Sequence, residues 1–292
     1  MTETTTKRVT DPLAPPSAVH SLNRGALTYA NTFESPIKRA IVHTIEWLTG
    51  KITIINLVRR FEKSGPYEGA DFWFGALKVM GIAVETQQDQ MNNIPEKGPA
   101  ILVANHPHGM VDGMVLAGLI GKRRDDYKIL TRSLLTNIDT VASNYLIPVP
   151  FPHETDAQKK FVEMRKQAME VLSAGGLVAL FPSGVVASSD TMFGPAIERE
   201  WNVFTAKMIR TSGATVIPCY FPGANSRWYQ AANRISATLR QSLLLFEIVH
   251  SRNKAQAPIV GAPIKAEDLK DRLKDPRDCM AWLRELTLSL KP

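Results

Sequence analysis

Hydrophobic positions follow two different patterns along the chain. From residue 36 to 63 they recur at intervals of three and four, which is the spacing of an amphipathic helix: Ile37, Ile41, Ile45, Leu48, Ile52 and Ile55. Beyond residue 80, short apolar runs alternate with helical patterns, and we expect strands near 82–85 and at 100–104, 128–130, 145–149, 177–181 and 215–220. Helices are expected between them at 70–79, 111–120, 157–173 and 199–211. This alternation predicts an α/β fold, a mainly parallel sheet flanked by helices, with an N-terminal amphipathic helical segment.

The same patterns divide the chain into three parts. Residues 1–35 are rich in threonine and proline and contain no apolar core of the signal-peptide type, so we expect a disordered tail. Residues 36–80 are predicted to be a helical membrane-association segment. Residues 81–292 are predicted to form the catalytic domain.

The basic character of residues 36–63 leaves two interpretations open. Six basic residues minus two acidic ones give this stretch a charge of about +4, and Trp47 and Phe61 could anchor it at a headgroup interface. It is either an interfacial membrane helix or a core-packing helix with a solvated basic face. The apolar run at 100–121 is long enough to span a bilayer, but Asn105 and Asp112 in it favour a buried strand, a polar turn and a buried helix.

The overall charge of the chain indicates which classes of binding partner to expect. The 292 residues include 35 Lys and Arg against 28 Asp and Glu, a net charge of +7 that favours an anionic membrane surface or a nucleic acid. Aromatic residues are 8% of the chain and scattered, unlike the clustered basic and aromatic platforms of RNA-binding proteins, so we expect no nucleic-acid partner. Cys219 and Cys279 form no Cys-x-x-Cys pair, which fits a reducing compartment and no structural zinc.

The candidate chemistry is concentrated in residues 105–113, Asn-His-Pro-His-Gly-Met-Val-Asp-Gly. The run falls where a buried strand should end and a helix begin, the usual place for ligand sites in open α/β sheets. His106 could accept a hydroxyl proton, and Asp112 could bond its other ring nitrogen and stabilise the imidazolium. The substrate alcohol would supply the nucleophile. His108 lies four residues before Asp112 and could share a helix face with it, so spacing alone leaves the choice between the two histidines open.

This run resembles the first motif of the lysophospholipid (glycerolipid) acyltransferases, and specifically the variant branch written Asn-His-Pro-x-Gly-x-x-Asp-Gly. Residues 176–184 resemble the family's third motif, an apolar strand followed by Phe-Pro-Glu-Gly-Thr-Arg. Phe181, Pro182 and Gly184 match it, whereas Ser183 replaces the glutamate and Val186 stands at the arginine position. In the family those two side chains are associated with binding glycerol phosphate, so the resemblance puts a phosphate-centred acceptor in doubt.

Further blocks extend the resemblance from about residue 97 to 264. Residues 128–150 resemble the second block, with Arg132 as the candidate contact for an anionic group or, alternatively, a surface ion pair. Residues 213–218 resemble the fourth block, while Gly223-x-Asn225-Ser226 and residues 261–264 resemble the variant branch. The implied catalytic residues are His106 and Asp112, with no metal, and the implied substrate-binding residues are Asn105, His108, Arg132, Phe181, Pro182, Ser183, Gly184 and Asn225.

The resemblance implies transfer of a fatty acyl group from an acyl-carrier-protein or coenzyme A thioester to a lysolipid hydroxyl, without a cofactor. It also implies a peripheral enzyme on the cytoplasmic face of the inner (plasma) membrane. Since related acyltransferases complete bacterial aminolipids by O-acylation, a lyso-aminolipid is one expected acceptor. Lysophosphatidic acid or another lysophospholipid is the alternative. Rival interpretations are a metal-dependent hydrolase using His106, His108 and Asp112, and a non-catalytic lipid-binding protein; no Gly-x-Ser-x-Gly elbow supports a serine hydrolase.

Overall fold

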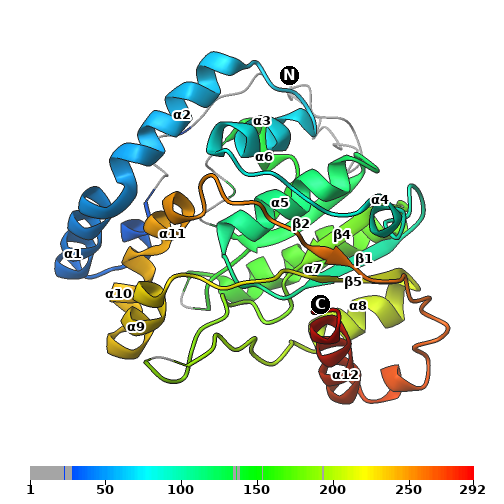
Figure 1. Ribbon diagram of the computed structural model, residues 1–292. Coiled ribbons are helices and arrows are strands. Elements are labelled where there is room, and N and C mark those ends of the chain that lie inside the picture. The colour runs from blue at the N-terminus through cyan, green and yellow to red at the C-terminus, as the bar shows by residue number, and fades with distance from the viewer. Residues whose placement is uncertain (1–22, 24–27, 134–135, 137–138, 153, 193) are drawn as a thin grey trace, which may run out of the picture.

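The computed structural model describes residue 23 and residues 28–133, 136, 139–152, 154–192 and 194–292 (Figure 1). A six-stranded sheet in the order β3-β2-β4-β1-β5-β6 forms its centre. Five strands are parallel, and only the short β6 runs antiparallel to its neighbour β5. Their bounds are β1 Ala100–Ala104, β2 Tyr127–Arg132, β3 Leu146–Val149, β4 Leu177–Leu180, β5 Thr215–Tyr220 and β6 Ile259–Val260. The predicted α/β fold with a mainly parallel sheet is therefore confirmed.

Helices cover both faces of this sheet, which is why the central strand β1 is buried along its whole length. Leu102 of β1 packs in a core with α2, α3, α5 and α11, whereas Ile101 and Val103 pack on the opposite face with α7, α8 and α12 (Figure 1). The helices are α1 Pro36–Glu46, α2 Ile52–Ser64, α3 Asp71–Met80, α4 Gln88–Met91, α5 Met110–Gly121, α6 Thr140–Ser143, α7 Ala157–Ser173, α8 Phe204–Ser212, α9 Arg227–Ile235, α10 Ala237–Ser242, α11 Leu244–His250 and α12 Pro276–Ser289.

Two predicted elements differ from the structure. The strand expected near 82–85 is wrong, because the backbone there makes only an isolated bridge between Val84 and Gln256. The helix expected from residue 199 begins at Phe204 instead. The preceding residues are held outside the helix by side-chain bonds: Arg199 donates to the Ser188 carbonyl, and the Trp201 indole donates to the Glu198 carboxylate.

The N-terminal helices α1 and α2 are joined by a π-helical turn, Trp47–Lys51. Gly50 in this turn approaches α11 closely, since a Cβ there would lie 3.1 Å from the Leu245 carbonyl oxygen. Lys51 is one of the six basic residues of 36–63, but it is buried, and this burial lowers its pKa against the opposing effect of Glu46. The exposed basic face is therefore smaller than the sequence indicated.

Contacts cross both predicted boundaries, at residues 35 and 80. Most of the expected disordered tail, residues 1–22 and 24–27, lies outside the described residues. Thr28 and Tyr29, by contrast, are fixed, because the buried Glu46 accepts hydrogen bonds from the Thr28 hydroxyl (2.6 Å) and the Tyr29 N–H (2.8 Å). At the second boundary, α2 and α3 share one continuous core with α5 and the sheet. In the described part of the chain, no helix combines the length and hydrophobicity needed to cross a bilayer.

Candidate active site

The turn between β1 and α5 positions the predicted catalytic pair at the carboxyl edge of the sheet. Strand β1 ends at Ala104 and α5 begins at Met110. Gly109 precedes the helix with φ +68° and ψ −127°, a backbone conformation that side chains with a Cβ rarely adopt. The turn can therefore be tight enough to bring residue 106 back over the first turn of α5.

His106 and Asp112 form a hydrogen-bonded pair. The Nδ1 of His106 lies 3.0 Å from Oδ2 of Asp112, whose side chain is fully buried. The same oxygen accepts the backbone N–H of His108 at 2.8 Å, so the carboxylate is held from two sides. The imidazole also stacks on the ring of Phe181, with 3.9 Å between centroids. Because Nδ1 donates to Asp112, the neutral imidazole presents a basic Nε2, as proton abstraction requires.

Three residues expected to bind substrate instead connect this turn to residues 221–225. The Asn105 amide bonds both backbone groups of Phe221, donating at 2.8 Å and accepting at 2.6 Å. His108 donates from Nε2 to the Pro222 carbonyl at 2.9 Å, so that nitrogen carries a proton and cannot act as a base. Asn225 is buried and donates its backbone N–H to Pro107.

Residue 223 shows why this connection needs glycine. It has φ +94°, and a Cβ there would lie 3.0 Å from ring atoms of His108. The buried Asn105 and Asn225 and the half-buried His108 do not line the cavity described below. Their positions also argue against a metal site, because the His108 ring faces a carbonyl instead of converging with His106 on a common point.

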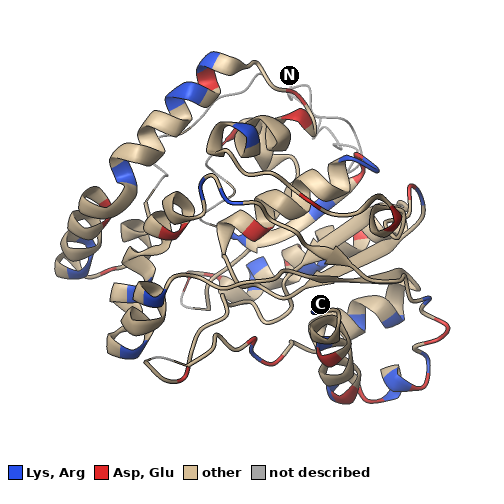
Figure 2. Cartoon of the chain, in the orientation of Figure 1, with Lys and Arg blue, Asp and Glu red and all other residues tan. Residues whose placement is uncertain are grey.

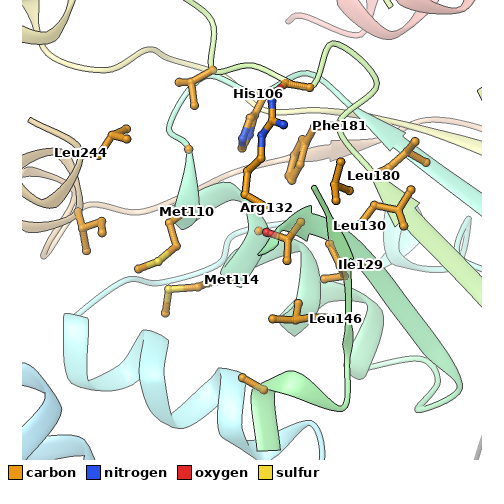
Figure 3. Close-up of a pocket in the computed structure, with 18 of the residues that line it drawn as sticks. His106, Met110, Met114, Ile129, Leu130, Arg132, Leu146, Leu180, Phe181 and Leu244 are labelled. Atoms are coloured by element: carbon orange, nitrogen blue, oxygen red, sulfur yellow. Dashed lines mark hydrogen bonds between the residues drawn. The ribbon is translucent and has the colours of Figure 1, made fainter. Parts of the chain in front are cut away.

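The Phe181–Gly184 loop, predicted to bind substrate, lines a cavity, and Figure 3 shows Phe181 among the lining side chains. The Ser183 hydroxyl donates to the Val185 carbonyl at 3.0 Å, and the Gly184 N–H donates to the Phe181 carbonyl at 2.9 Å. The Gly184 amide is thus already occupied, which leaves the N–H groups of Ser183 and Val185 as the candidate donors for an oxyanion.

Arg132 approaches this loop from β2. Its guanidinium donates to the Gly184 carbonyl at 2.8 Å and lies 4.9 Å from the centroid of the Phe151 ring. Burial lowers the pKa of this arginine, partly offset by the Glu154 carboxylate. Val186 also lines the cavity, so the position that carries arginine in the family motif is apolar here. Arg132 therefore supplies a positive charge from another strand.

Glu198 is a site residue that the sequence patterns did not reveal. Its buried carboxylate accepts the backbone N–H of His106 at 3.0 Å through one oxygen and the Trp201 indole N–H at 2.9 Å through the other. It lies 92 residues from His106 in the sequence. No local spacing rule links two residues so far apart, so only the fold could identify this contact.

A cavity of 620 Å³ runs past His106 along the carboxyl edge of the sheet. Its inner part is apolar and lies between α2, α3 and α5, where it is lined by Leu57, Phe61, Trp73, Met80, Met110 and Met114. Three arginines also line it, Arg132, Arg165 and Arg240, against one aspartate, Asp139. The cavity thus combines a deep apolar region with a positive balance of charged side chains near the proton acceptor.

The comparison with protein families identifies the chemistry. The family model described as "Acyltransferase" matches residues 85–222, which contain both the His106–Asp112 pair and the Phe181–Gly184 loop. The chain is 26% identical to a lyso-glycine lipid O-acyltransferase of Phocaeicola vulgatus over 230 residues, 76% of this chain and 78% of that protein.

A second lyso-glycine lipid O-acyltransferase, from Bacteroides thetaiotaomicron, is also 26% identical to this protein, over 76% of this chain and 80% of that protein. Among solved structures, the 1-acyl-sn-glycerophosphate (LPA) acyltransferase PlsC from Thermotoga maritima superposes with a TM-score of 0.43 at 16% identity. That superposition covers 90% of this chain and 87% of the other.

Proposed function

We propose that this protein moves a fatty acyl group from a thioester, carried by acyl-carrier protein or coenzyme A, to the hydroxyl of a lyso-aminolipid. The observation that carries the proposal is the His106–Asp112 pair beside a deep apolar cavity. Nε2 of His106 takes the hydroxyl proton as the acceptor oxygen attacks the thioester carbonyl. The new C–O bond replaces the C–S bond, the thiolate leaves, and the imidazolium returns the proton to it. Asp112 stabilises the imidazolium meanwhile.

The lining of the cavity supports a lipid as substrate. The apolar part between α2, α3 and α5 offers a continuous hydrophobic surface to an acyl chain, and burying each methylene contributes about 0.8 kcal/mol. Cys219 supports direct transfer without a cysteine acyl-enzyme: it is buried, and burial together with the nearby Asp112 carboxylate raises the pKa of its thiol.

The charged residues favour an anionic acceptor. Arg132, Arg165 and Arg240 outnumber Asp139 in the cavity lining, so a carboxylate or a phosphate headgroup would be attracted there. Ser183 and Val186 leave the loop without the charged pair associated with glycerol phosphate. The two relatives named as lyso-glycine lipid O-acyltransferases support an amino-acid headgroup with a free carboxylate. Lysophosphatidic acid or another lysophospholipid is the second candidate, since Arg132 could bind its phosphate.

We also propose that the enzyme is peripheral, on the cytoplasmic face of the inner membrane. The side chains of Ile37, Leu48 and Ile52 extend from α1, the π-helical turn and α2 into solvent. Leu48 is 81% exposed, which is unusual for a large aliphatic residue unless it meets an apolar phase. The net charge of +7 suits both an anionic membrane surface and the anionic acyl carriers.

The assignment of the base is tested by thiol release from an acyl thioester in the presence of a lysolipid. His106→Ala should lower kcat by about 10²–10⁴-fold, the usual effect of removing a general base. Asp112→Asn should also be strongly impaired with the fold intact, because the imidazole tautomer is no longer fixed. His108→Ala should lose less, and His43→Ala, at a half-buried position on α1, serves as the control. An active His106→Ala enzyme would refute the assignment.

The acceptor is tested by competition between an N-acylated amino acid bearing a free 3-hydroxy group and lysophosphatidic acid, with one acyl thioester. We expect kcat/KM to favour the aminolipid. A tenfold or greater preference for lysophosphatidic acid, about 1.4 kcal/mol in the transition state, would overturn this choice in favour of the second candidate. Binding of both lipids without any thiol release would instead indicate a non-catalytic lipid-binding protein.

A further inference from the structure

Helix α9 presents an apolar face to solvent that the fold does not use. Tyr229 and Ala232 point inward and are buried, whereas Trp228 is 74% exposed and Ile235 is 68% exposed. A tryptophan and an isoleucine exposed to this degree on one nine-residue helix form a surface distinct from the exposed side chains of α1 and α2. Surfaces of this kind mark contacts with a protein or a membrane.

The charges around this face favour an anionic membrane over a protein. Residues 201–246 contain no Asp or Glu, and their five basic residues are Lys207, Arg210, Arg227, Arg234 and Arg240. Arg227 and Arg234 are exposed on α9 itself, next in sequence to Trp228 and Ile235. The nearby acid Asp190 is paired with Arg199 at 2.6 Å. Tryptophan beside arginine is the combination found at the headgroup level of anionic bilayers.

The position of α9 in the fold also favours a membrane as the partner of this face. Helix α9 packs on α10, and α10 packs on α1, so the three helices lie at one edge of the molecule (Figure 1). Basic residues of all three occur at this edge (Figure 2). The cavity is lined from the same region by Arg240 and Gln241 of α10, Leu244 of α11 and Val58 of α2. Helices α1 and α9 therefore both lie beside α10, which lines the cavity.

We propose that Arg227, Trp228, Arg234 and Ile235 of α9 form a second membrane-contact surface, which inserts into the headgroup region of an anionic bilayer. Together with α1 it holds the cavity against the membrane, so a lysolipid enters without crossing water. This role for the cavity rests on the proposed function. The membrane contact itself does not, because it is measured without turnover.

Insertion is measured from the fluorescence of Trp228 with vesicles that contain anionic lipid and brominated acyl chains. The Trp47→Phe variant is used as the background protein. Of its remaining tryptophans other than Trp228, Trp73 and Trp201 are buried, and Trp282 of α12 is partly buried and lies against Arg272. We expect strong quenching, which disappears when Trp228→Phe is added. Absence of quenching by these vesicles would overturn the proposal. A change in emission that depends on protein concentration and not on lipid would overturn it too, and would identify a second copy of this chain as the occupant.

Vesicle sedimentation then tests the contribution of the surface. The double variant Trp228→Glu, Ile235→Glu should bind anionic vesicles at least fivefold more weakly than the parent. Val162→Glu is the matched control, because Val162 is 63% exposed on α7, which packs on β3, β4 and α8. Equal binding by the double variant and the control would refute the proposal.

Turnover of a short-chain, water-soluble acceptor separates the two proposals. It should be unchanged in the double variant, because neither Trp228 nor Ile235 lines the cavity. Loss of this soluble activity in the double variant, with the fold intact, would overturn the membrane role. If the parent enzyme does not turn over the water-soluble acceptor, that result counts against the proposed function. The vesicle-binding result would remain valid.

Discussion

At the scale of single residues, His106, the proposed base, is held by two buried carboxylates. Asp112 bonds the imidazole ring of His106, and Glu198 bonds its backbone N–H. The first contact fixes the direction of the ring, and the second fixes the position of the chain that carries it. Catalysis depends on both, because a displacement of about 1 Å can lower a rate by about 10²-fold.

We therefore predict that Glu198→Ala lowers kcat roughly 10–100-fold with little change in KM. The change leaves the His106 N–H and the Trp201 indole without acceptors, at a stability cost of roughly 1–3 kcal/mol per buried donor. Glu198→Gln should be intermediate, because the amide offers one acceptor oxygen in place of two. Steady-state kinetics and thermal unfolding measure the two effects. A raised KM with unchanged kcat would contradict a positioning role for Glu198.

Residue patterns in the sequence predicted that His106 and Asp112 would pair, but not the contacts of the residues around them. His106 and Asp112 are six positions apart, so a single strand-helix turn brings them together, and local spacing reveals them. Glu198 arrives through tertiary contacts that no spacing encodes. Asn105 was expected to contact substrate, yet it bonds backbone groups of Phe221, since an amide side chain suits either role and only the fold decides.

At the scale of elements, the helical spacing of residues 36–63 predicted helices, but not the direction in which their apolar side chains face. Ile37, Ile41 and Leu48 are exposed, whereas Ile54 and Leu57 of α2 are buried. The sequence could not tell which apolar side chains faced the core, because both sets recur at three and four residues. The structure shows that the segment does both: it packs on the core through one face and exposes apolar side chains on the other.

This division allows a test that leaves the core intact. The double variant Ile41→Glu, Leu48→Glu should reduce binding to anionic vesicles at least tenfold, because burying each aliphatic side chain contributes roughly 1.5–3 kcal/mol. Lys38→Gln is the companion variant and should reduce mainly the salt-sensitive part of binding. Sedimentation with vesicles at low and high salt separates the two contributions. Unchanged binding by the double glutamate variant would count against α1 as a membrane contact.

At the scale of the whole molecule, the N-terminal helices are part of the main core. Phe61 of α2 packs against Phe72 of α3, with ring centroids 5.0 Å apart, and both belong to the core that includes Leu102 of β1. Removal of residues 1–63 would therefore uncover that core, whereas the sequence indicated a separable segment. Composition and periodicity identify a helix, but they do not show whether its neighbours depend on it.

We predict that Phe61→Ala destabilises the whole protein by about 3–5 kcal/mol, the usual cost of deleting a buried phenylalanine side chain. Calorimetry should show one cooperative transition shifted to lower temperature. Val162→Ala on the exposed face of α7 is the control and should shift it little. Two separate transitions, with only the first affected by Phe61→Ala, would support an independent N-terminal unit instead.

The π-helical turn Trp47–Lys51 has a geometric consequence for both ends of this segment. Each residue of an α-helix advances the chain by about 100° around the axis. A π-helical turn holds more residues than an α-helical turn, so it changes the direction in which the side chains of the preceding helix point. Losing one residue between α1 and α2 would rotate α1 by about that angle. Glu46 would swing away from Thr28, and Ile37 would leave the exposed face. The length of this turn, independently of its side chains, thus sets the direction in which α1 faces.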